Sequence, residues 1–188
     1  MEELLIFLNS IHPLNPVTRD YLVEKLKWIE VPKKNFILKQ GHICFNIYFI
    51  NRGLLRCFYT IEGKEISSWF MREGDVIISV ESFFNQTASK ENIQALEECL
   101  LFYISYDELQ YAYRSFPDFN TIGRILTQKY YQLSEQRLYS LRMQRAHDKY
   151  LFLLNYFPQI IQRVPLKYVA SYLGITEETL SRIRAQRN

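Results

Sequence analysis

The residues with the clearest chemical potential lie near the C-terminal end of the chain, at positions 164–184. Ala170 is small enough to let a second helix cross closely, and Gly174 can adopt the left-handed conformation that ends a helix. Thr176 follows, and its hydroxyl group can cap the next helix. The apolar residues that would join the two helices are Leu166, Val169, Leu173, Ile175, Leu180 and Ile183. This spacing predicts a helix-turn-helix.

The second of these helices would expose polar and charged side chains that suit the major groove of DNA. Arg182 could donate two hydrogen bonds to guanine, and Glu178 could accept one from the amino group of cytosine. Basic side chains beside them would contact phosphates and make the affinity salt-dependent. We therefore predict double-stranded DNA as the partner, the alternative being a helical hairpin that only packs. The predicted DNA-binding residues are Lys167, Thr176, Glu177, Glu178, Thr179, Ser181, Arg182, Arg184 and Arg187.

Charge is unevenly distributed along the 188 residues. The formal net charge is only +3, but residues 1–136 carry 14 Lys or Arg and 17 Asp or Glu, whereas residues 137–188 carry 9 and 3. A basic C-terminal end favours binding to a polyanion, although a solvated helix surface can have the same composition.

Composition excludes several classes of protein. Apolar residues make up 48% and charged residues 23%, which is typical of a folded globular chain. The three cysteines are isolated and the three histidines are not at ligand spacing, so we expect no disulfide framework, metal site or iron–sulfur cluster. No apolar run reaches the roughly 20 residues of a membrane span, and the acidic start Met1-Glu2-Glu3 differs from a signal peptide. We therefore expect a cytoplasmic protein without a membrane partner.

The rest of the chain must position the C-terminal helices, and its pattern changes twice. Residues 2–9 and 16–28 have helical spacing, whereas residues 28–104 contain short β-rich runs between turn signals. Glu62-Gly63 is expected to form a hairpin turn because Gly63 tolerates a positive φ. The predicted strands are 35–39, 46–51, 54–61, 65–70, 76–80, 93–96 and 100–104. Several short strands at this spacing predict an antiparallel sandwich or barrel.

After Ser105 the pattern becomes helical and stays so. Ser105 is expected to cap a helix over 106–115, and Pro117 opens a helix of about 25 residues, close to 40 Å in length. Its apolar stripe exceeds what a small barrel needs for cover, so we expect part of it to meet a second copy of the chain. The alternative is a helix packed wholly on its own domain. The stripe consists of Phe119, Ile122, Ile125, Leu126, Tyr130, Leu133, Leu138 and Leu141.

With this order of elements, the chain resembles the Crp/Fnr (catabolite activator type) transcription regulators, in a short form similar to Bacteroidetes members. Gly41 and residues 46–53 look like the family's glycine, spacer and Tyr-x-Ile-x-x-Gly pattern, and Gly74-Asp75 matches the turn before its phosphate-binding segment. The resemblance implies an α+β fold with an N-terminal jelly-roll, cyclic-nucleotide-binding-like barrel, a long dimerisation helix and a C-terminal helix-turn-helix domain. The expected domains are residues 1–116, 117–144 and 145–188.

The resemblance also implies a function: a homodimeric, sequence-specific regulator that reads a palindromic operator and whose barrel senses an effector. RNA polymerase is a further candidate partner. Two alternatives stay open, namely a ligand-independent regulator with a scaffold barrel and a sensor module that acts through protein–protein contact. An enzyme is disfavoured because the β-rich region has a single histidine, His42, and no Ser/His/Asp or Cys/His arrangement. We accordingly predict no catalytic residue and no metal ligand.

The predicted effector site departs from the pattern of cyclic-AMP-binding members. Ile78 and Ser79 stand where those members carry a Gly-Glu pair, and Ser89-Lys90 stands where they carry the Arg-Ser pair that holds the cyclic phosphate. Without the arginine, a buried phosphate would lose a charge-assisted hydrogen bond. We therefore expect that cyclic AMP is not the effector, and we predict no cofactor. The predicted pocket residues are Ser79, Glu81, Ser82, Ser89, Asn92 and Gln94.

Overall fold

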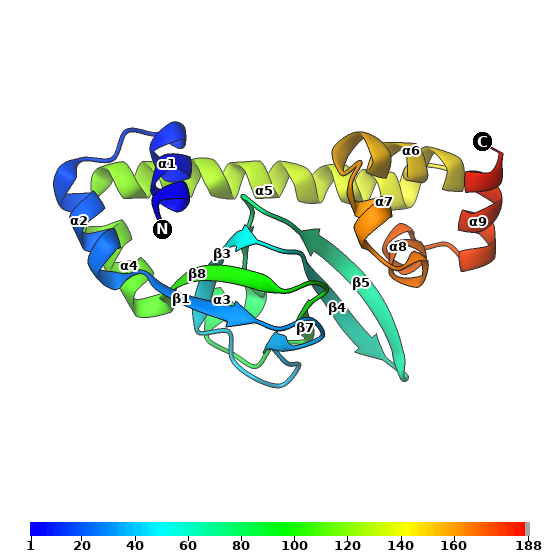
Figure 1. Cartoon of the computed structure of the whole chain (residues 1–188), viewed down its shortest axis with the longest axis horizontal. Coiled ribbons are helices and arrows are strands. Elements are labelled where there is room, and N and C mark those ends of the chain that lie inside the picture. Colours follow the sequence, from blue (N-terminus) through cyan, green and yellow to red (C-terminus); the bar gives the residue numbers. More distant parts are fainter. Residues whose placement is uncertain (187–188) are drawn as a thin grey trace.

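The computed structural model describes residues 1–186, in which helices flank a β-rich middle on both sides (Figure 1). The helices are α1 (Glu2–Ile11), α2 (Pro16–Lys25), α3 (Val80–Asn85), α4 (Tyr106–Ser115), α5 (Pro117–Met143), α6 (Ala146–Tyr156), α7 (Ile160–Arg163), α8 (Leu166–Leu173) and α9 (Glu177–Ala185). The strands are β1 (Lys27–Val31), β2 (Phe36–Leu38), β3 (Asn46–Arg52), β4 (Leu55–Ile61), β5 (Lys64–Met71), β6 (Val76–Ile77), β7 (Glu91–Ala95) and β8 (Cys99–Ser105). The fold class is thus α+β, as expected.

The strands form two four-stranded antiparallel sheets that face each other as a jelly-roll sandwich. One sheet has the strand order β1-β8-β3-β6, and the other has the order β2-β7-β4-β5. Side chains that alternate along the strands fill the space between the sheets, where Ile50, Ile93 and Leu101 are completely buried. The predicted hairpin is confirmed, because Glu62 and Gly63 join β4 to β5 with φ values of 50° and 75°. Positive φ at both positions matches the right-handed twist of the flanking strands.

The first difference from the prediction lies at the start of the sandwich. The helix expected over 16–28 ends at Lys25, and Lys27–Val31 forms β1 instead. Every residue of β1 pairs with a residue of β8. A longer helix would forfeit this ladder, so pairing with a distant strand overrides the helical spacing of the local sequence.

The second difference follows β6. The strand expected over 76–80 pairs only at Val76–Ile77, and the chain then turns into the short helix α3. Phe83 explains this helical turn, because its ring is fully buried and meets the ring of Tyr106 at a centroid distance of 5.4 Å. The helix thereby places an aromatic anchor in the core, where an edge-to-face contact adds to burial.

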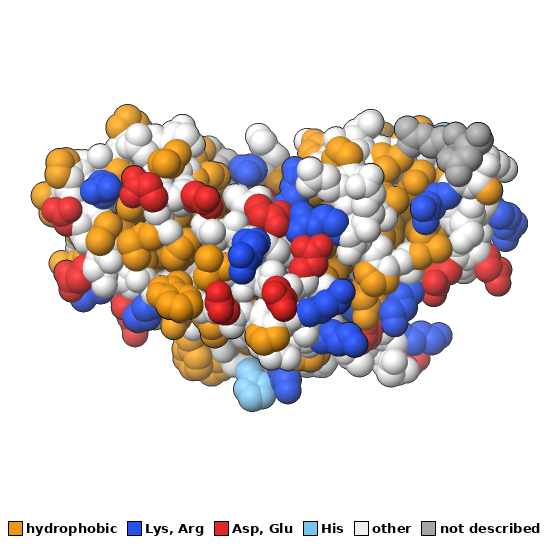
Figure 2. All heavy atoms as spheres, viewed as in Figure 1, with side chains coloured by type: hydrophobic (Ala, Val, Ile, Leu, Met, Phe, Trp, Pro, Cys, Tyr) orange, Lys and Arg blue, Asp and Glu red, His pale blue; other side chains and the backbone are white. Residues whose placement is uncertain are grey.

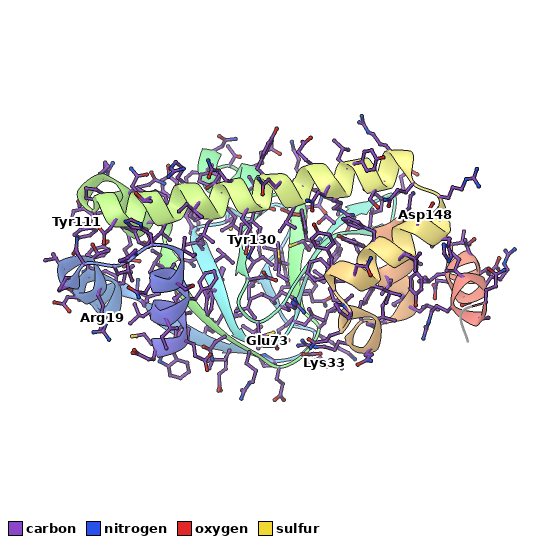
Figure 3. All side chains as sticks on the ribbon, turned by 90° about the horizontal axis from the view of Figure 1, so that it is seen from above. Arg19, Lys33, Glu73, Tyr111, Tyr130 and Asp148 are labelled. Carbon is purple, nitrogen blue, oxygen red and sulfur yellow. The ribbon has the colours of Figure 1, made fainter. Side chains whose placement is uncertain are left out.

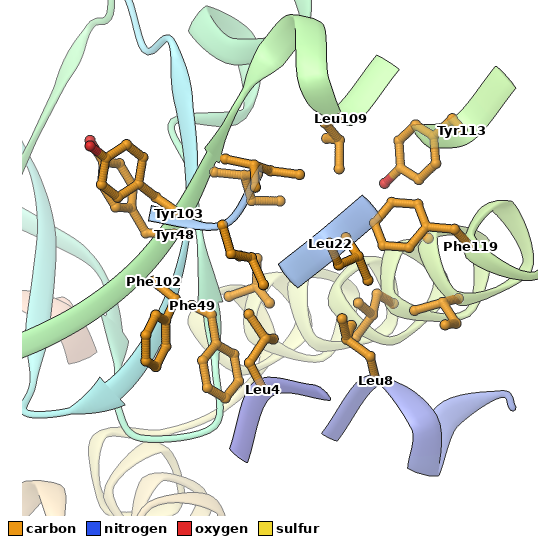
Figure 4. A pocket seen from close by; sticks show the side chains of 17 residues that line it. Leu4, Leu8, Leu22, Tyr48, Phe49, Phe102, Tyr103, Leu109, Tyr113 and Phe119 are labelled. Atoms are coloured by element: carbon orange, nitrogen blue, oxygen red, sulfur yellow. The ribbon is translucent and has the colours of Figure 1, made fainter. Parts of the chain in front are cut away.

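The helix α5 crosses the whole molecule, with α1 and α2 at one end, the sandwich along its middle and α6 to α9 at the other end (Figure 1). Its 27 residues begin at Pro117, as predicted. The predicted cap of the preceding helix is also confirmed, because Ser105 and Glu108 form a reciprocal capping box at the start of α4. A small apolar cavity of about 70 Å³ remains where α1, α2 and α5 meet the sandwich, beside Leu22 and Phe119 (Figure 4).

The C-terminal helices share an apolar core with the sandwich. Leu54 and Phe70 from the sandwich belong to the same buried cluster as Leu153, Val169 and Leu180 from α6, α8 and α9. This half of the molecule therefore packs against the β-region. Among the residues that the structure describes, no helix combines the length and the apolar character that crossing a membrane requires.

Candidate functional site

A cavity of about 540 Å³ lies between the β4–β5 side of the sandwich and the helix α5. This volume is in the range of small-molecule sites. Much of its wall is aromatic, with Tyr59 from β4, Trp69 from β5 and Tyr130 from α5. Tyr130 projects from the middle of α5 toward the strands (Figure 3), and its hydroxyl oxygen accepts a 2.8 Å hydrogen bond from the amide of Val76. Burial raises the pKa of Tyr130, so the phenol is neutral and fixes α5 to the sandwich.

Three of the six residues predicted for the pocket line this cavity, namely Ser79, Glu81 and Ser82. The hydroxyl of Ser82 is engaged in the wall itself, because it donates to the carbonyl oxygen of Thr87 at 2.5 Å. Ser89 is buried behind the wall, with its Oγ 3.0 Å from the Oγ of Ser79. Ser79 therefore lines the cavity, and the hydroxyl of Ser89 lies behind it.

The other two predicted pocket residues, Asn92 and Gln94, do not line the cavity, and the alternation of side chains along β7 explains why. Glu91 faces the cavity, so positions 92 and 94 project from the opposite side of the strand. There the Oδ1 of Asn92 accepts a 3.0 Å hydrogen bond from the amide of Gln40, and the Nε2 of Gln94 donates one of 2.9 Å to the carbonyl oxygen of Lys34. Both side chains hold neighbouring loops in place.

The acid in the cavity wall, Glu91, was not among the residues predicted from the sequence. This residue is 9% exposed, and its carboxylate accepts a 3.3 Å hydrogen bond from the Oγ of Ser68. Burial raises the pKa of Glu91, and hydrogen bonds from Ser79 and Ser68 oppose that rise. Across residues 1–186 it takes part in no ion pair. The sequence signal was an acidic residue directly after Lys90. Only the pairing of β7 with β4 shows which of these two side chains points into the sandwich.

Lys90, one of the two residues that stand in place of the Arg-Ser pair, directs its charge outward. Its Nζ lies 2.8 Å and 2.9 Å from the two carboxylate oxygens of Glu81. The two side chains are 71% and 60% exposed, so this ion pair sits at the solvent rim of the cavity. The interior therefore has a carboxylate as its charged group and no unpaired cation among the residues described.

The three cysteines, Cys44, Cys57 and Cys99, are all buried and unbridged. Burial raises the pKa of Cys57 well above its ordinary value and that of Cys99 to about 11. They are therefore protonated thiols that pack like small apolar side chains. No group of three potential metal-ligating side chains occurs within the described part of the chain.

The two helices at the C-terminal end have the local features predicted for them. Gly174 ends α8 in the left-handed conformation, with φ 64°. The Oγ1 of Thr176 caps α9 by accepting a 3.2 Å hydrogen bond from the amide of Thr179. Ala170 and Leu180 are buried between the helices, 2% and 0% exposed. Side chains of α9 on the other side of the helix are consequently free of the core.

Of the residues predicted to contact DNA, Lys167 lies at the start of α8, and the other described ones lie at the cap of α9 or along it. Lys167, Thr176, Glu177, Glu178, Ser181, Arg182 and Arg184 are exposed, and Thr179 is half-buried. Arg187 lies outside the described residues. Figure 2 shows basic side chains, mixed with acidic ones, over the half of the molecule that carries these helices. The structure thus brings the described members together on one short helix and its immediate surroundings.

A layer of polar contacts fixes α8 to the sandwich, and the sequence analysis did not predict it. The guanidinium of Arg56, completely buried, stacks on the ring of Tyr168 at 3.6 Å and donates to the Oγ of Ser67 at 2.9 Å. Ser171 accepts from the amide of Ser67 at 2.9 Å and donates to the carbonyl oxygen of Glu65 at 3.1 Å. β5 and α8 are therefore joined through side chains and backbone together.

A second connection between the two halves runs through Arg163 of α7. Its guanidinium donates to both carboxylate oxygens of Glu73 at 2.9 Å and also contacts the carboxylate of Glu97. Glu73 and Glu97 come from the β5–β6 and β7–β8 loops, so one arginine bridges two loops of the sandwich. Figure 3 shows Glu73 at the edge of the sandwich, next to the C-terminal helices. The hydrogen bond with Arg163 is the main reason that the pKa of Glu73 is lowered from 4.5 to about 2.

Replacing Arg163 by alanine is expected to reduce the free energy of unfolding by about 1 kcal/mol at neutral pH, because the pairs are partly exposed. The folded-state pKa of Glu73 lies below its unfolded value, so the stabilisation is complete above about pH 4.5 and is lost as the pH falls toward about 2. The difference between wild type and R163A should therefore shrink below pH 4.5 in urea titrations. Lys90→Ala, which breaks an exposed pair, is the control with an effect near zero. A difference as large at pH 3 as at pH 7 would contradict the assignment.

Comparisons with known proteins agree with this geometry. Residues 28–116 match the family model of the cyclic nucleotide-binding domain. FixK2 from Bradyrhizobium japonicum has a TM-score of 0.72 and 16% identity, covering 86% of this chain and 83% of that one. A protein from Eubacterium rectale, described as a regulator of the Crp/Fnr family, has a TM-score of 0.71 and 16% identity, covering 92% and 83%.

A third structure of the same fold is the c-di-GMP-responsive global regulator CLP from Xanthomonas campestris. Its TM-score is 0.69 with 15% identity, covering 92% of this chain and 91% of that one. At such low identities the likeness concerns the fold. A comparison with curated proteins gives no match.

Proposed function

We propose that this chain, which carries a cyclic nucleotide-binding domain at residues 28–116 within the fold of Crp/Fnr transcription regulators, is a homodimeric, sequence-specific DNA-binding regulator. Its family and structural neighbours are regulators and not enzymes. In this proposal residues 1–116 sense an effector, residues 117–144 connect and dimerise, and residues 145–188 bind DNA. The proposed location is the cytoplasm, and RNA polymerase is proposed as a further partner.

The observation that carries the proposal is the exposed polar face of α9. Leu180 and Ile183 turn the apolar side of the helix toward α8, which leaves Arg182 exposed on the other side. Helices held in this way by a preceding helix and a tight turn are those that enter a major groove. An arginine on such a face has the geometry for bidentate recognition of guanine.

The C-terminal half of α5 supports the dimer in this proposal. Tyr131, Leu138 and Tyr139 are 66%, 42% and 61% exposed, although each has a large apolar side chain. An apolar surface of this kind on one helix suits a protein interface. A second copy of α5 laid along it would cover these side chains and set two α9 helices side by side, as a palindromic operator requires.

The effector of the barrel is proposed not to be cyclic AMP. The cyclic phosphate needs a cation inside the cavity, whereas Lys90 is bound to Glu81 at the rim and the interior charge is that of Glu91. Bringing a phosphate anion beside a buried carboxylate is unfavourable, because both charges lose hydration and repel each other. This agrees with the expectation from the missing Arg-Ser pair.

The test is selection of duplexes bound by the full chain from a random library, with oligomeric state measured by light scattering. We expect a dimer and an enriched inverted repeat whose half-site centres are about one helical turn apart. Affinity for the selected site should fall steeply with salt. If no sequence is enriched over random duplex, the regulator proposal fails in favour of a module that acts through protein contact. If DNA is selected but nothing binds in the barrel, the barrel is a scaffold.

A further inference from the structure

We propose that the cavity beside α5 takes a cationic amphipathic small molecule, a protonated amine with an aromatic body, whose ammonium group pairs with Glu91. The inference rests on the proposed function only in taking this cavity as the effector site. It names the chemical class of that effector, which neither the family match nor the structural neighbours indicate.

Glu91 has unmet capacity for hydrogen bonds. A carboxylate has about four sites for accepting them, and here the hydroxyl of Ser68 donates to one. The residue is 9% exposed and lines the cavity, so its remaining capacity is directed into the cavity. A buried carboxylate without a cationic partner is unfavourable, and a ligand that brings an ammonium group removes that penalty.

The cations nearest the cavity are engaged elsewhere. Arg137, whose guanidinium lies 5.9 Å from the ring of Trp69, donates to the carbonyl oxygens of Ser67 and Tyr172. The ammonium of Lys90 binds both oxygens of Glu81 in an exposed ion pair. The guanidinium of Arg56 lies on the outer side of β4, where it binds Glu65 and stacks on Tyr168. Among the described residues that line the cavity, Glu91 is therefore the charged group without an ion-pair partner, which favours positive ligands over anions.

The space around Glu91 has the size and the lining for an apolar body with a positive head. Tyr59, Trp69, Phe84 and Tyr130 contribute aromatic surface to a cavity of about 540 Å³. Aromatic faces bind flat apolar bodies and attract ammonium groups. A ligand that reaches from Glu91 to Tyr130 would touch both the sandwich and α5, which suits a molecule with a polar head and an apolar body.

The strand beside this site, β5, also holds the C-terminal helices. Ser68 of β5 bonds to Glu91 in the cavity, while the adjacent Ser67 bonds to Ser171 of α8. A ligand that draws Glu91 away from Ser68 thus acts on the strand that anchors α8. The adjacent residues Ser67 and Ser68 therefore connect the proposed effector cavity with α8 in the proposed DNA-binding half.

The experiment is titration calorimetry on the full chain, without DNA, with matched probes of opposite charge. Tryptamine carries an ammonium group on an indole ring, whereas indole-3-acetate carries a carboxylate on the same ring. We expect tryptamine and phenethylamine to bind at least about tenfold more tightly than indole-3-acetate, because a charge-assisted hydrogen bond is gained in one case and a repulsion in the other. Binding of indole-3-acetate or cyclic AMP as tight as that of the amines, or no binding of either amine at millimolar concentration, would overturn the proposal.

Two substitutions then locate the binding charge. Glu91→Gln keeps the shape of the side chain and is expected to weaken tryptamine binding about ten- to hundredfold. Glu62→Gln removes an exposed carboxylate of the β4–β5 hairpin that does not line the cavity, and it should leave the affinity within about twofold. The melting temperature of E91Q should equal or exceed that of the wild type, since a buried charge is removed. Equal affinity of E91Q and wild type for tryptamine would overturn the assignment of Glu91.

The same measurements separate this inference from the proposed function. Amine binding that depends on Glu91 but does not change the affinity for a selected operator would support the ligand class and remove the link to DNA. DNA binding that persists while no amine binds would leave the regulator proposal intact and reject the ligand class.

Discussion

Replacing Gly53 by alanine is expected to lower the free energy of unfolding by about 3 kcal/mol or more. Gly53 follows β3 with a φ of 104°, a conformation that a side chain strains. A Cβ atom there would lie 2.7 Å from the carbonyl oxygen of Glu98 and 2.5 Å from the Sγ of Cys99. Backbone on one side and a buried thiol on the other leave little room to adjust. Urea denaturation followed by circular dichroism measures the loss.

Gly63→Ala is the matched control for this prediction. Gly63 also has a positive φ, of 75°, but a Cβ atom there would meet nothing within 4 Å. Its loss should be only about 1 kcal/mol, from backbone strain alone. Equal losses in the two variants would show that the close approach of Gly53 to β8 contributes nothing. The amide of Gly53 also donates to the carboxylate of Glu73 at 2.8 Å. A shift of the backbone at position 53 would therefore also weaken the contact between Glu73 and Arg163.

Arg182→Ala is expected to weaken binding to the selected operator by about a hundredfold or more, because each half-site of a dimer loses a bidentate contact of about 1–3 kcal/mol. Affinity for random duplex should change far less, so the variant loses specificity rather than general DNA binding. Fluorescence anisotropy with the operator and with a scrambled duplex measures both. Arg182 is exposed, so the melting temperature of the variant should match that of the wild type.

Arg184 provides the comparison within the same helix. It is exposed two residues further along and is proposed to contact phosphate. Arg184→Ala should weaken operator and random duplex to a similar extent and reduce the salt slope by about one. If R182A and R184A behave alike, with equal loss on both duplexes, Arg182 does not read a base.

The parts of the molecule that could be predicted are those in which the signal is local. Gly174 and Thr176 define the end of one helix and the cap of the next through their own backbone and hydroxyl geometry, and both were confirmed. The capping box at Ser105 and the hairpin at Gly63 are of the same kind. In each place a few neighbouring residues determine the conformation, so the sequence contains the information.

The parts that were missed depend on partners distant in the sequence. β1 exists because β8 offers a ladder, and the direction of Glu91 depends on how β7 pairs with β4. The three lining residues among the six predicted were found from the turn at Gly74-Asp75, whereas Asn92 and Gln94 share a strand with Glu91 but not its face. A shift of one residue reverses inside and outside, and only long-range pairing determines it.

The contacts of α8 with β5 have a consequence for how this chain avoids edge-to-edge aggregation of its sheets. β5 is the outermost strand of its sheet, with β4 as its neighbour, so one row of its peptide groups lacks a strand partner. Ser171 occupies the amide of Ser67 and the carbonyl oxygen of Glu65 on that row. Unprotected sheet edges recruit strands from other copies and lead to aggregation. The C-terminal helices therefore cover this edge of the sheet. In any state in which they move away from β5, the edge is exposed to pairing with strands of other copies.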